Sequence, residues 1–189
     1  MEEIKVEKKR YYPALGGKDN QTQLTDWWLS LESERGGRAE LKRCQTLIET
    51  AICRPTHTLR FRLPYWNRHP EIVACIAGIL SAVRQDTGPN GLSFAEQLAK
   101  PREGSSKSPV SESRFQKLLK SRSWDEFYIH LRRNVQLVKG NINICSLADG
   151  VIQWGEQHFA QEVKTGSDTL KFQWSNDYYR MFLKQKGNK

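Results

Sequence analysis

Apolar residues recur at helical spacing along much of the chain and predict a protein built from helices. The strongest segment follows Pro70, where the apolar positions are Ile72, Cys75, Ile76, Ile79, Leu80 and Val83. Their spacing of three and four residues is that of one face of an α-helix. Small residues fill the positions between them, and no charge appears until Arg84. We therefore expect this helix to be buried on nearly every side.

The segment 111–140 combines apolar stripes with many basic residues. The apolar side of its first helix comprises Phe115, Leu118 and Leu119. Ser123 followed by Glu126 forms the pattern of a capping box, so a second helix is expected to begin there and to end at Gly140. The buried stripe of the second helix is expected to be Trp124, Phe127, Tyr128, Leu131, Val135 and Val138.

Shorter helices are expected in the N-terminal half. Thr25 is a candidate cap for a helix that the glycine pair 36–37 closes. Another short helix follows over 38–44. Residues 46–63 predict a broken helix, and Pro55 is well placed to start its second piece.

The C-terminal part adds two more helical segments. Asn143 is placed to cap a helix that extends to Phe159. Residues 170–174, LKFQW, alternate like a strand, but the chain offers no partner strand, and the residues that follow are again helical in pattern.

These patterns predict an all-α fold, a compact bundle of roughly six to eight helices that is open to a division into two lobes joined by a polar linker. The expected parts are a flexible N-terminal arm (1–23), an N-terminal helical lobe (24–99), a linker (100–111) and a C-terminal helical lobe (112–189).

The charge of the chain is strongly positive and unevenly distributed. Its 189 residues carry a net charge of +9, which favours nucleic acid or an anionic membrane surface as a partner. Residues 100–139 hold ten Lys and Arg against four Asp and Glu, and residues 38–68 hold seven against two. Phosphate binding requires such clusters, because each neutralised phosphate releases counterions. On composition alone, charge that only keeps a soluble protein dispersed is the alternative.

The cysteines and the apolar runs bear on cofactors and location. None of the four cysteines forms a C-x-x-C pair, and no histidine lies at metal-finger spacing from one, so we expect reduced thiols, no metal and no other cofactor. The N-terminus, MEEIKVEKKRYYP, has no signal-peptide core, and the longest apolar run, 72–83, is too short to span a bilayer. We expect a soluble cytoplasmic protein without a membrane partner.

Two other functions compete with nucleic-acid binding. The first is a metal-dependent nuclease that uses Asp149, Glu162 and Lys164. Such sites need carboxylates that converge on one ion from neighbouring strands, whereas the pattern around Asp149 is helical, so we expect no catalytic residues. The second is a helical adaptor whose basic face meets an acidic protein partner.

Five segments, in order and spacing, resemble one protein family. They are RGGRAELKRC, SFAEQLA, VSESRFQKLLKSRSWDEFYIHLRRNVQLVKG, SLADGVIQWG and WSNDYY. Together they resemble the CasB family, the small subunit of the type I-E CRISPR Cascade surveillance complex. The chain departs from that family in its longer, charged N-terminal arm and in Gln157 and His158, where the family often has basic residues.

The resemblance implies a compact, all-helical, non-enzymatic protein, two copies of which line the inner face of the complex. Its implied partners are crRNA and target DNA, contacted through their backbones, together with other Cascade subunits and a second copy of itself. Base pairing would read the sequence, and the protein would read backbone and shape. The basic residues expected to hold the nucleic acid are Arg38, Lys42, Arg43, Arg68, Arg114, Lys117, Lys120, Arg122, Arg132, Arg133 and Lys139.

Overall fold

The computed structural model describes residues 10–63, 69–160 and 166–186, and these residues form an all-α protein, as predicted. Their helices are α1 (Lys18–Ser33), α2 (Arg35–Arg43), α3 (Leu47–Ala51), α4 (Arg54–Arg62), α5 (Pro70–Leu80), α6 (Phe94–Ala99), α7 (Glu112–Leu119), α8 (Trp124–Leu137), α9 (Ile144–Phe159) and α10 (Leu170–Lys186). Short segments such as α3 and α6 form separate helices, so the described ranges contain more helices than predicted. They also contain a 3₁₀ turn (Gly166–Asp168) and a parallel pair of two-residue strands, β1 (Gln85–Asp86) and β2 (Asn141–Ile142).

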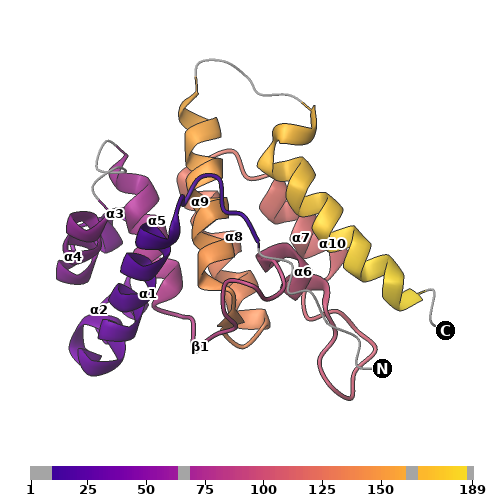
Figure 1. Ribbon diagram of the computed structural model, residues 1–189, viewed down its shortest axis with the longest axis horizontal. Helices are drawn as coiled ribbons and strands as arrows, with labels where there is room; N and C mark the ends of the chain where they lie inside the picture. The colour runs from indigo at the N-terminus through magenta and orange to yellow at the C-terminus, as the bar shows by residue number, and fades with distance from the viewer. Residues whose placement is uncertain (1–9, 64–68, 161–165, 187–189) are drawn as a thin grey trace.

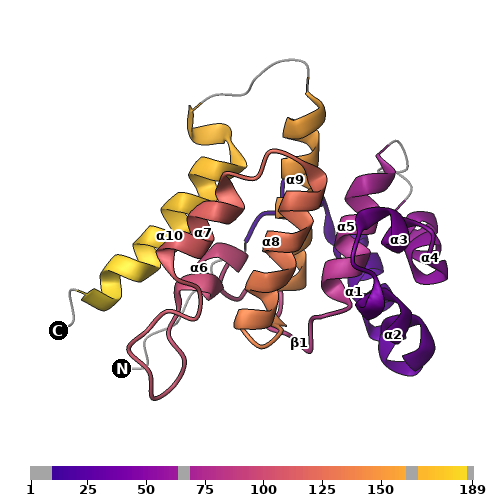
Figure 2. The ribbon, with the colours of Figure 1, turned by 180° about the vertical axis from the view of Figure 1, so that it is seen from behind.

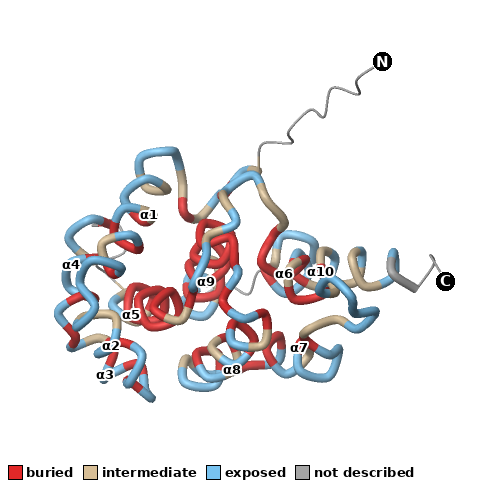
Figure 3. Tube along the Cα trace, turned by 90° about the horizontal axis from the view of Figure 1, so that it is seen from below, coloured by how far each residue is buried: buried red, intermediate tan, exposed pale blue. Residues whose placement is uncertain are grey.

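Helices α5, α8 and α9 occupy the centre of the molecule (Figures 1 and 2). Helices α1 to α4 lie on one side of them, and α6, α7 and α10 lie on the other. α5 is buried at every position from Ile72 to Leu80, which confirms the prediction for this helix. The buried residues of α5 and α9 lie deep in the molecule (Figure 3), and one apolar cluster extends from Tyr12 to Tyr178.

Several helix boundaries follow the local signals in the sequence. The Ser123 side chain accepts a hydrogen bond from the Glu126 N–H at the start of α8. The Glu126 carboxylate, however, accepts from the N–H of Arg122 rather than from that of Ser123, so the reciprocal half of the capping box is displaced by one residue. Asn143 caps α9 by accepting from the Ser146 N–H, as predicted.

Gly140 closes the connection between α8 and α9. Its φ of 73° lies in the left-handed region, and so does the φ of 59° at Lys139. The Gly140 carbonyl accepts from the Arg84 N–H at 2.8 Å, and a Cβ at Gly140 would lie 2.7 Å from the Ala82 carbonyl oxygen. The turn therefore lies directly against the chain that leaves α5, and this contact fixes the position of Lys139 on the surface.

The first helix starts earlier than the sequence indicated. α1 begins at Lys18, and the Thr25 hydroxyl donates to the Gln21 carbonyl inside the helix instead of capping its start. The start carries no side-chain cap, so local sequence gives little sign of it. Residues 18–23, predicted to be part of a flexible arm, are therefore helical, and Leu15 before them is fully buried.

The glycine pair 36–37 does not close α1. That helix ends at Ser33, and both glycines lie within α2. A Cβ at Gly37 would lie 2.8 Å from the Cγ of Pro55, so the missing side chain allows α2 to approach α4 closely. A glycine that serves packing gives the same sequence signal as a glycine that ends a helix.

The LKFQW segment is the first turn of α10 and not an extended lead-in. Leu170 and Trp174 are both buried, at 2% and 5% exposure. Residues four apart lie on the same face of a helix, so these two positions satisfy a helical period as well as the alternation that indicated a strand.

A buried carboxylate ties α6 to segments distant in sequence. Glu96 accepts from Arg180 at 2.7 Å and also pairs with Arg10, while Ser93 donates to Asp177 at 2.6 Å. Burial raises the pKa of Glu96, but the Ser93 N–H and the two guanidiniums outweigh it and hold that pKa below its usual range. α6 thus packs against α10, although the predicted N-terminal lobe included it; the division into lobes itself stays a prediction.

We expect Gly150→Ala to lower the free energy of unfolding by about 1–3 kcal/mol, the usual cost of overpacking a core. A Cβ at this position of α9 would overlap the ring of Trp174, which is buried in α10. Gly36→Ala is the matched control, because among the described residues nothing lies within 4 Å of a Cβ there. Urea denaturation measures both variants, and equal midpoints would contradict this account of the α9–α10 contact.

Candidate nucleic-acid interface

Helices α7 and α8 pack side by side (Figure 2). A groove lies between them. Phe115, Leu118 and Leu119 are buried on the inner side of α7, as predicted. The groove, which we call the α7–α8 groove, has a volume of ≈ 400 Å³ and is lined by Arg114, Lys117, His130, Arg133, Asn134, Gln136 and Leu137. Among the described residues no Asp or Glu lines it, so its lining favours an anion.

Asn134 also lines this groove and carries a buried polar side chain. Asn134 is 2% exposed, and its side-chain nitrogen has no hydrogen-bond partner among the described residues. A buried polar group without a partner costs free energy unless a ligand or water satisfies it. The unpaired side-chain nitrogen of Asn134 lies beneath the surface of the groove, which the residue helps to line.

The positive charges of the groove affect the pKa of His130. Burial lowers the pKa of this imidazole, and the nearby charges of Arg133 and Lys117 lower it further, while Glu126 acts in the opposite direction. Arg114, Lys117 and Arg133 are exposed and form no ion pair among the described residues. The groove thus holds positive charge that the protein itself leaves largely uncompensated.

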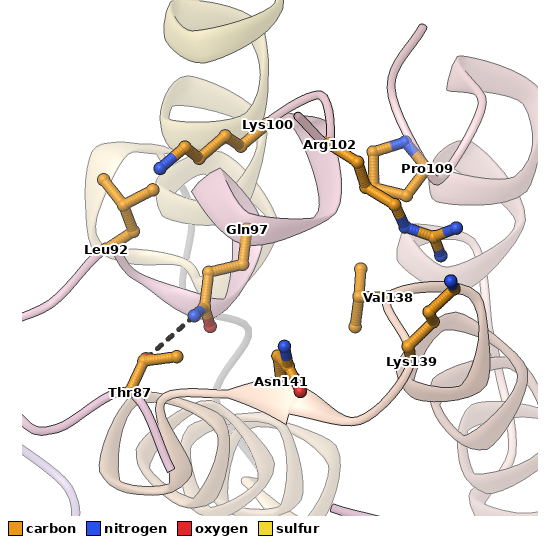
Figure 4. Close-up of a pocket in the computed structure, with 9 residues that line it drawn as sticks. All are labelled: Thr87, Leu92, Gln97, Lys100, Arg102, Pro109, Val138, Lys139 and Asn141. Atoms are coloured by element: carbon orange, nitrogen blue, oxygen red, sulfur yellow. Dashed lines mark hydrogen bonds between the residues drawn. The ribbon is translucent and has the colours of Figure 1, made fainter. Parts of the chain in front are cut away.

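A second basic hollow lies beyond the C-terminal end of α8. It has a volume of ≈ 420 Å³, and its cations are Lys100, Arg102 and Lys139. Figure 4 shows the charged ends of Arg102 and Lys139 toward one edge of this hollow, which we call the Lys139 hollow, and Lys100 toward the other. Thr87, Gln97 and Asn141 contribute neutral polar groups, and no acidic residue lines the hollow in the described part of the chain.

The two basic hollows adjoin each other along α8. Leu137 lines the groove, the next residue, Val138, lines the Lys139 hollow, and Arg102 donates a hydrogen bond to the Leu137 carbonyl. α8 has 14 residues. Its length is about 21 Å at about 1.5 Å per residue, which equals about six nucleotides at about 3.4 Å per nucleotide of one strand.

Arg38 has a structural role that the sequence did not reveal. Its guanidinium donates to the carbonyls of Ser81, at 3.1 Å, and Val83, and it pairs with Glu32. Its side chain is only 14% exposed, and burial, together with Arg84, lowers its pKa. Arg38 therefore binds the carbonyls of the C-cap residue of α5, Ser81, and of Val83 in the segment that leaves the helix.

Arg132 makes the equivalent contact at the end of α2. It donates to the backbone carbonyls of Lys42 and Cys44, and its Nη1 lies 3.4 Å from the Tyr128 hydroxyl. Arg133, the next residue, is about 100° further round the helix and lines the α7–α8 groove. The two adjacent arginines thus serve different surfaces.

The other predicted contact residues fall into three groups. Lys42 and Arg43 are exposed on α2. Partial burial lowers the pKa of Lys42, and the nearby charges of Arg38 and Arg84 lower it further. Lys120 and Arg122 are exposed at the α7–α8 turn, a few residues after Lys117, which lines the groove. Arg68 lies outside the described residues.

The sequence analysis did not single out Lys100, Arg102, His130 or Asn134, which line the α7–α8 groove and the Lys139 hollow. The first two belong to the predicted linker and were therefore not assigned to a surface. Asn134 did leave a signal, because it interrupts the apolar spacing of Leu131, Val135 and Val138 with a polar side chain.

The residues of the nuclease alternative have other partners or cannot be placed. The Asp149 carboxylate is 6% exposed and accepts from the N–H groups of Ala14 and Leu15, both at 2.8 Å, and from the Gln153 side chain. Burial raises its pKa, and these hydrogen bonds act in the opposite direction. Asp149 thus anchors the N-terminal segment to α9, while Glu162 and Lys164 lie outside the described residues.

No three His, Cys, Asp or Glu side chains in the described ranges are grouped to hold a metal ion, and no described helix is long and apolar enough to cross a membrane. All four cysteines are buried free thiols.

We expect Arg38→Ala and Arg132→Ala each to lower the free energy of unfolding by about 2 kcal/mol, because each removes charge-assisted hydrogen bonds at a helix end. Arg133→Ala is the control and should change it by less than about 0.5 kcal/mol, as is usual for an exposed side chain. Urea denaturation of the three variants tests this. A loss at Arg133 as large as that at Arg132 would show that the two residues do not differ in this way.

We expect Arg133→Gln to raise the pKa of His130, because it removes one of the charges that oppose its protonation. The pKa in the folded chain lies below the ordinary 6.5, so protonation opposes folding, and stability falls as the pH drops from above 6.5 toward the folded pKa. An NMR titration of the imidazole measures the change. Arg54→Gln on α4 is the control, and an unchanged His130 pKa in the Arg133 variant would refute the proximity of these charges.

A comparison with known families identifies the chain. Residues 37–179 match the family described as CRISPR-associated protein Cse2. No curated protein and no solved structure matches this chain. The matched region covers most of the 189 residues and includes the α7–α8 groove and the Lys139 hollow. The match also agrees with the resemblance to the CasB family, because CasB and Cse2 are two names for the same family. The chain therefore belongs to the Cse2 family and is a CRISPR Cascade subunit.

Proposed function

We propose that this Cascade subunit is a non-catalytic protein that binds the backbones of crRNA and target DNA and thereby stabilises the R-loop. The observation that carries the proposal is the α7–α8 groove. In the described part of the chain, its three cations form no ion pair, its lining holds no acidic group, and its buried Asn134 donor lacks a partner.

The chemistry of the groove suits phosphate rather than bases. Arg114 and Arg133 present guanidiniums that match two oxygens of a phosphate, and Lys117 adds a point charge. Contacts of this kind position a strand and carry no sequence information. Sequence recognition would then come from base pairing between crRNA and target, as in RNA-guided complexes generally.

A small binding energy is sufficient for this role. Forming an R-loop exchanges one duplex for another of about equal stability, so contacts to the backbone can decide the balance. Each phosphate neutralised on a single strand contributes about −0.7 to the slope of log affinity against log salt concentration. The groove and the Lys139 hollow together offer six cationic side chains apart from histidine: Lys100, Arg102, Arg114, Lys117, Arg133 and Lys139.

We propose contacts with other Cascade subunits and with a second copy of this chain, in the cytoplasm and without a membrane. No feature of the described residues specifically favours the alternative of a protein adaptor with an acidic partner. That alternative predicts no affinity for nucleic acid at low salt.

We expect the double substitution Arg114→Glu with Arg133→Glu to weaken binding to single-stranded DNA and to reduce the steepness of its salt dependence by about 1.4, or about 0.7 for each lost contact. Arg54→Glu with Arg62→Glu, exposed on α4, changes the net charge equally and serves as the control. Fluorescence anisotropy over a salt series, repeated with RNA and duplex DNA, measures both pairs. Equal losses in the two pairs would mean that only net charge matters, and no binding by the unaltered chain would favour the adaptor.

A further inference from the structure

A column of stacked aromatic rings runs outward from the core along α9. Phe127 lies nearly parallel to Trp174, with centroids 6.3 Å apart, and to Trp154, at 4.2 Å and 8°. Trp154 in turn stacks on His158 at 4.8 Å and 11°. The first three rings are buried, whereas His158 is exposed. The column therefore ends in a ring on the surface.

Cations and neutral polar groups surround this exposed end. A hollow of ≈ 350 Å³ there is lined by Trp154 and His158 from α9, by Arg122 from the α7–α8 turn and by Lys171 from α10. Ser121, Gln157 and Thr169 complete the lining, and no acidic residue contributes to it within the described ranges. We call it the His158 hollow, and its volume falls in the range of about 300–1,000 Å³ that is usual for sites of small organic groups.

The position of the hollow extends the phosphate surface. Ser121 and Arg122 follow α7 and line this hollow, while Lys117, four residues before Ser121, lines the α7–α8 groove. A strand in the groove would reach the His158 hollow by continuing past this turn. The three hollows are thus arranged along one helix pair, with the aromatic one at the end opposite the Lys139 hollow.

We propose that the His158 hollow binds one unpaired nucleobase, stacked on the His158 ring, with the adjoining phosphate held by Arg122 and Lys171. This inference rests on the proposed function, because it names the ligand at the end of the same surface. Aromatic side chains beside a positive groove bind unpaired bases of any sequence, since every base has a flat π-face. Bases in a duplex already stack on one another, so the site selects a single strand.

The test compares normal and abasic oligonucleotides, which share the same phosphates. Full-length chain is titrated with single-stranded oligonucleotides at low salt, one with all its bases and one in which abasic units replace them. His158→Ala should weaken binding of the normal strand about fivefold or more, the lower end of the usual loss when a stacked base loses its ring. Binding of the abasic strand and of duplex DNA should not change. His158→Phe should restore the affinity for the normal strand, because it keeps a ring on the Trp154 face.

Two further variants separate this inference from the proposed function. Arg122→Ala with Lys171→Ala should weaken binding of normal and abasic strands equally, and His57→Ala, an exposed histidine on α4, should have no effect. Thermal unfolding shows whether His158→Ala keeps its fold. If it does not, the affinity of His158→Phe for the normal strand is compared with that of the unaltered chain instead. If the unaltered chain binds normal and abasic strands equally well, no base is stacked and the inference is wrong, while the phosphate-binding proposal stands. Absence of binding to any strand overturns both.

Discussion

The structure depends on the close approach of α5 to α8 and α9. A Cβ at Gly78 in α5 would lie 2.5 Å from the Tyr128 hydroxyl of α8, and a Cβ at Gly155 in α9 would lie 2.6 Å from Ile72 of α5. Only glycine at these two positions lets the helices meet without displacing a buried side chain. α8 is therefore held firmly from its inner side, and its outer side, with α7 packed beside it, can present a groove of fixed shape. A surface that binds by charge and shape requires such a rigid support.

Positive charge in this chain serves two separate purposes. Arg38 and Arg132 use their guanidiniums on the carbonyls at the ends of α5 and α2, so they connect helices to one another. Arg114 and Arg133, in contrast, face a groove in which the described residues offer them no anionic partner. A net charge of +9 is thus a poor measure of binding capacity, because part of it stabilises the fold. The aromatic residues also serve two purposes: Phe127 packs in the core, whereas His158 is exposed to solvent.

Much of the fold could be predicted from local patterns, and the candidate site only in part. The buried helix α5, the cap at Ser123 and the cap at Asn143 follow from spacing and residue type alone. The start of α1 and the role of Gly37 could not, because packing against distant helices decides them. The apolar side of α7 and the many basic residues of its segment could be recognised in the sequence. Which of two adjacent arginines, Arg132 or Arg133, points at a carbonyl depends on where α2 ends, and a single sequence does not contain that information.

We propose that the α7–α8 groove, with the two hollows that continue it, holds the strand, and that the rest of the basic surface does not. The most direct test is an NMR titration of the ¹⁵N-labelled chain with a short single-stranded oligonucleotide, observed at side-chain nitrogens. We expect the NMR signals of the Asn134 side-chain amide and the Arg133 guanidinium to shift on binding, because both residues line the groove. The signals of the Arg38 and Arg132 guanidiniums should not shift. Shifts at Arg38 and Arg132 with none at Asn134 would contradict it and would place the nucleic acid on a different face.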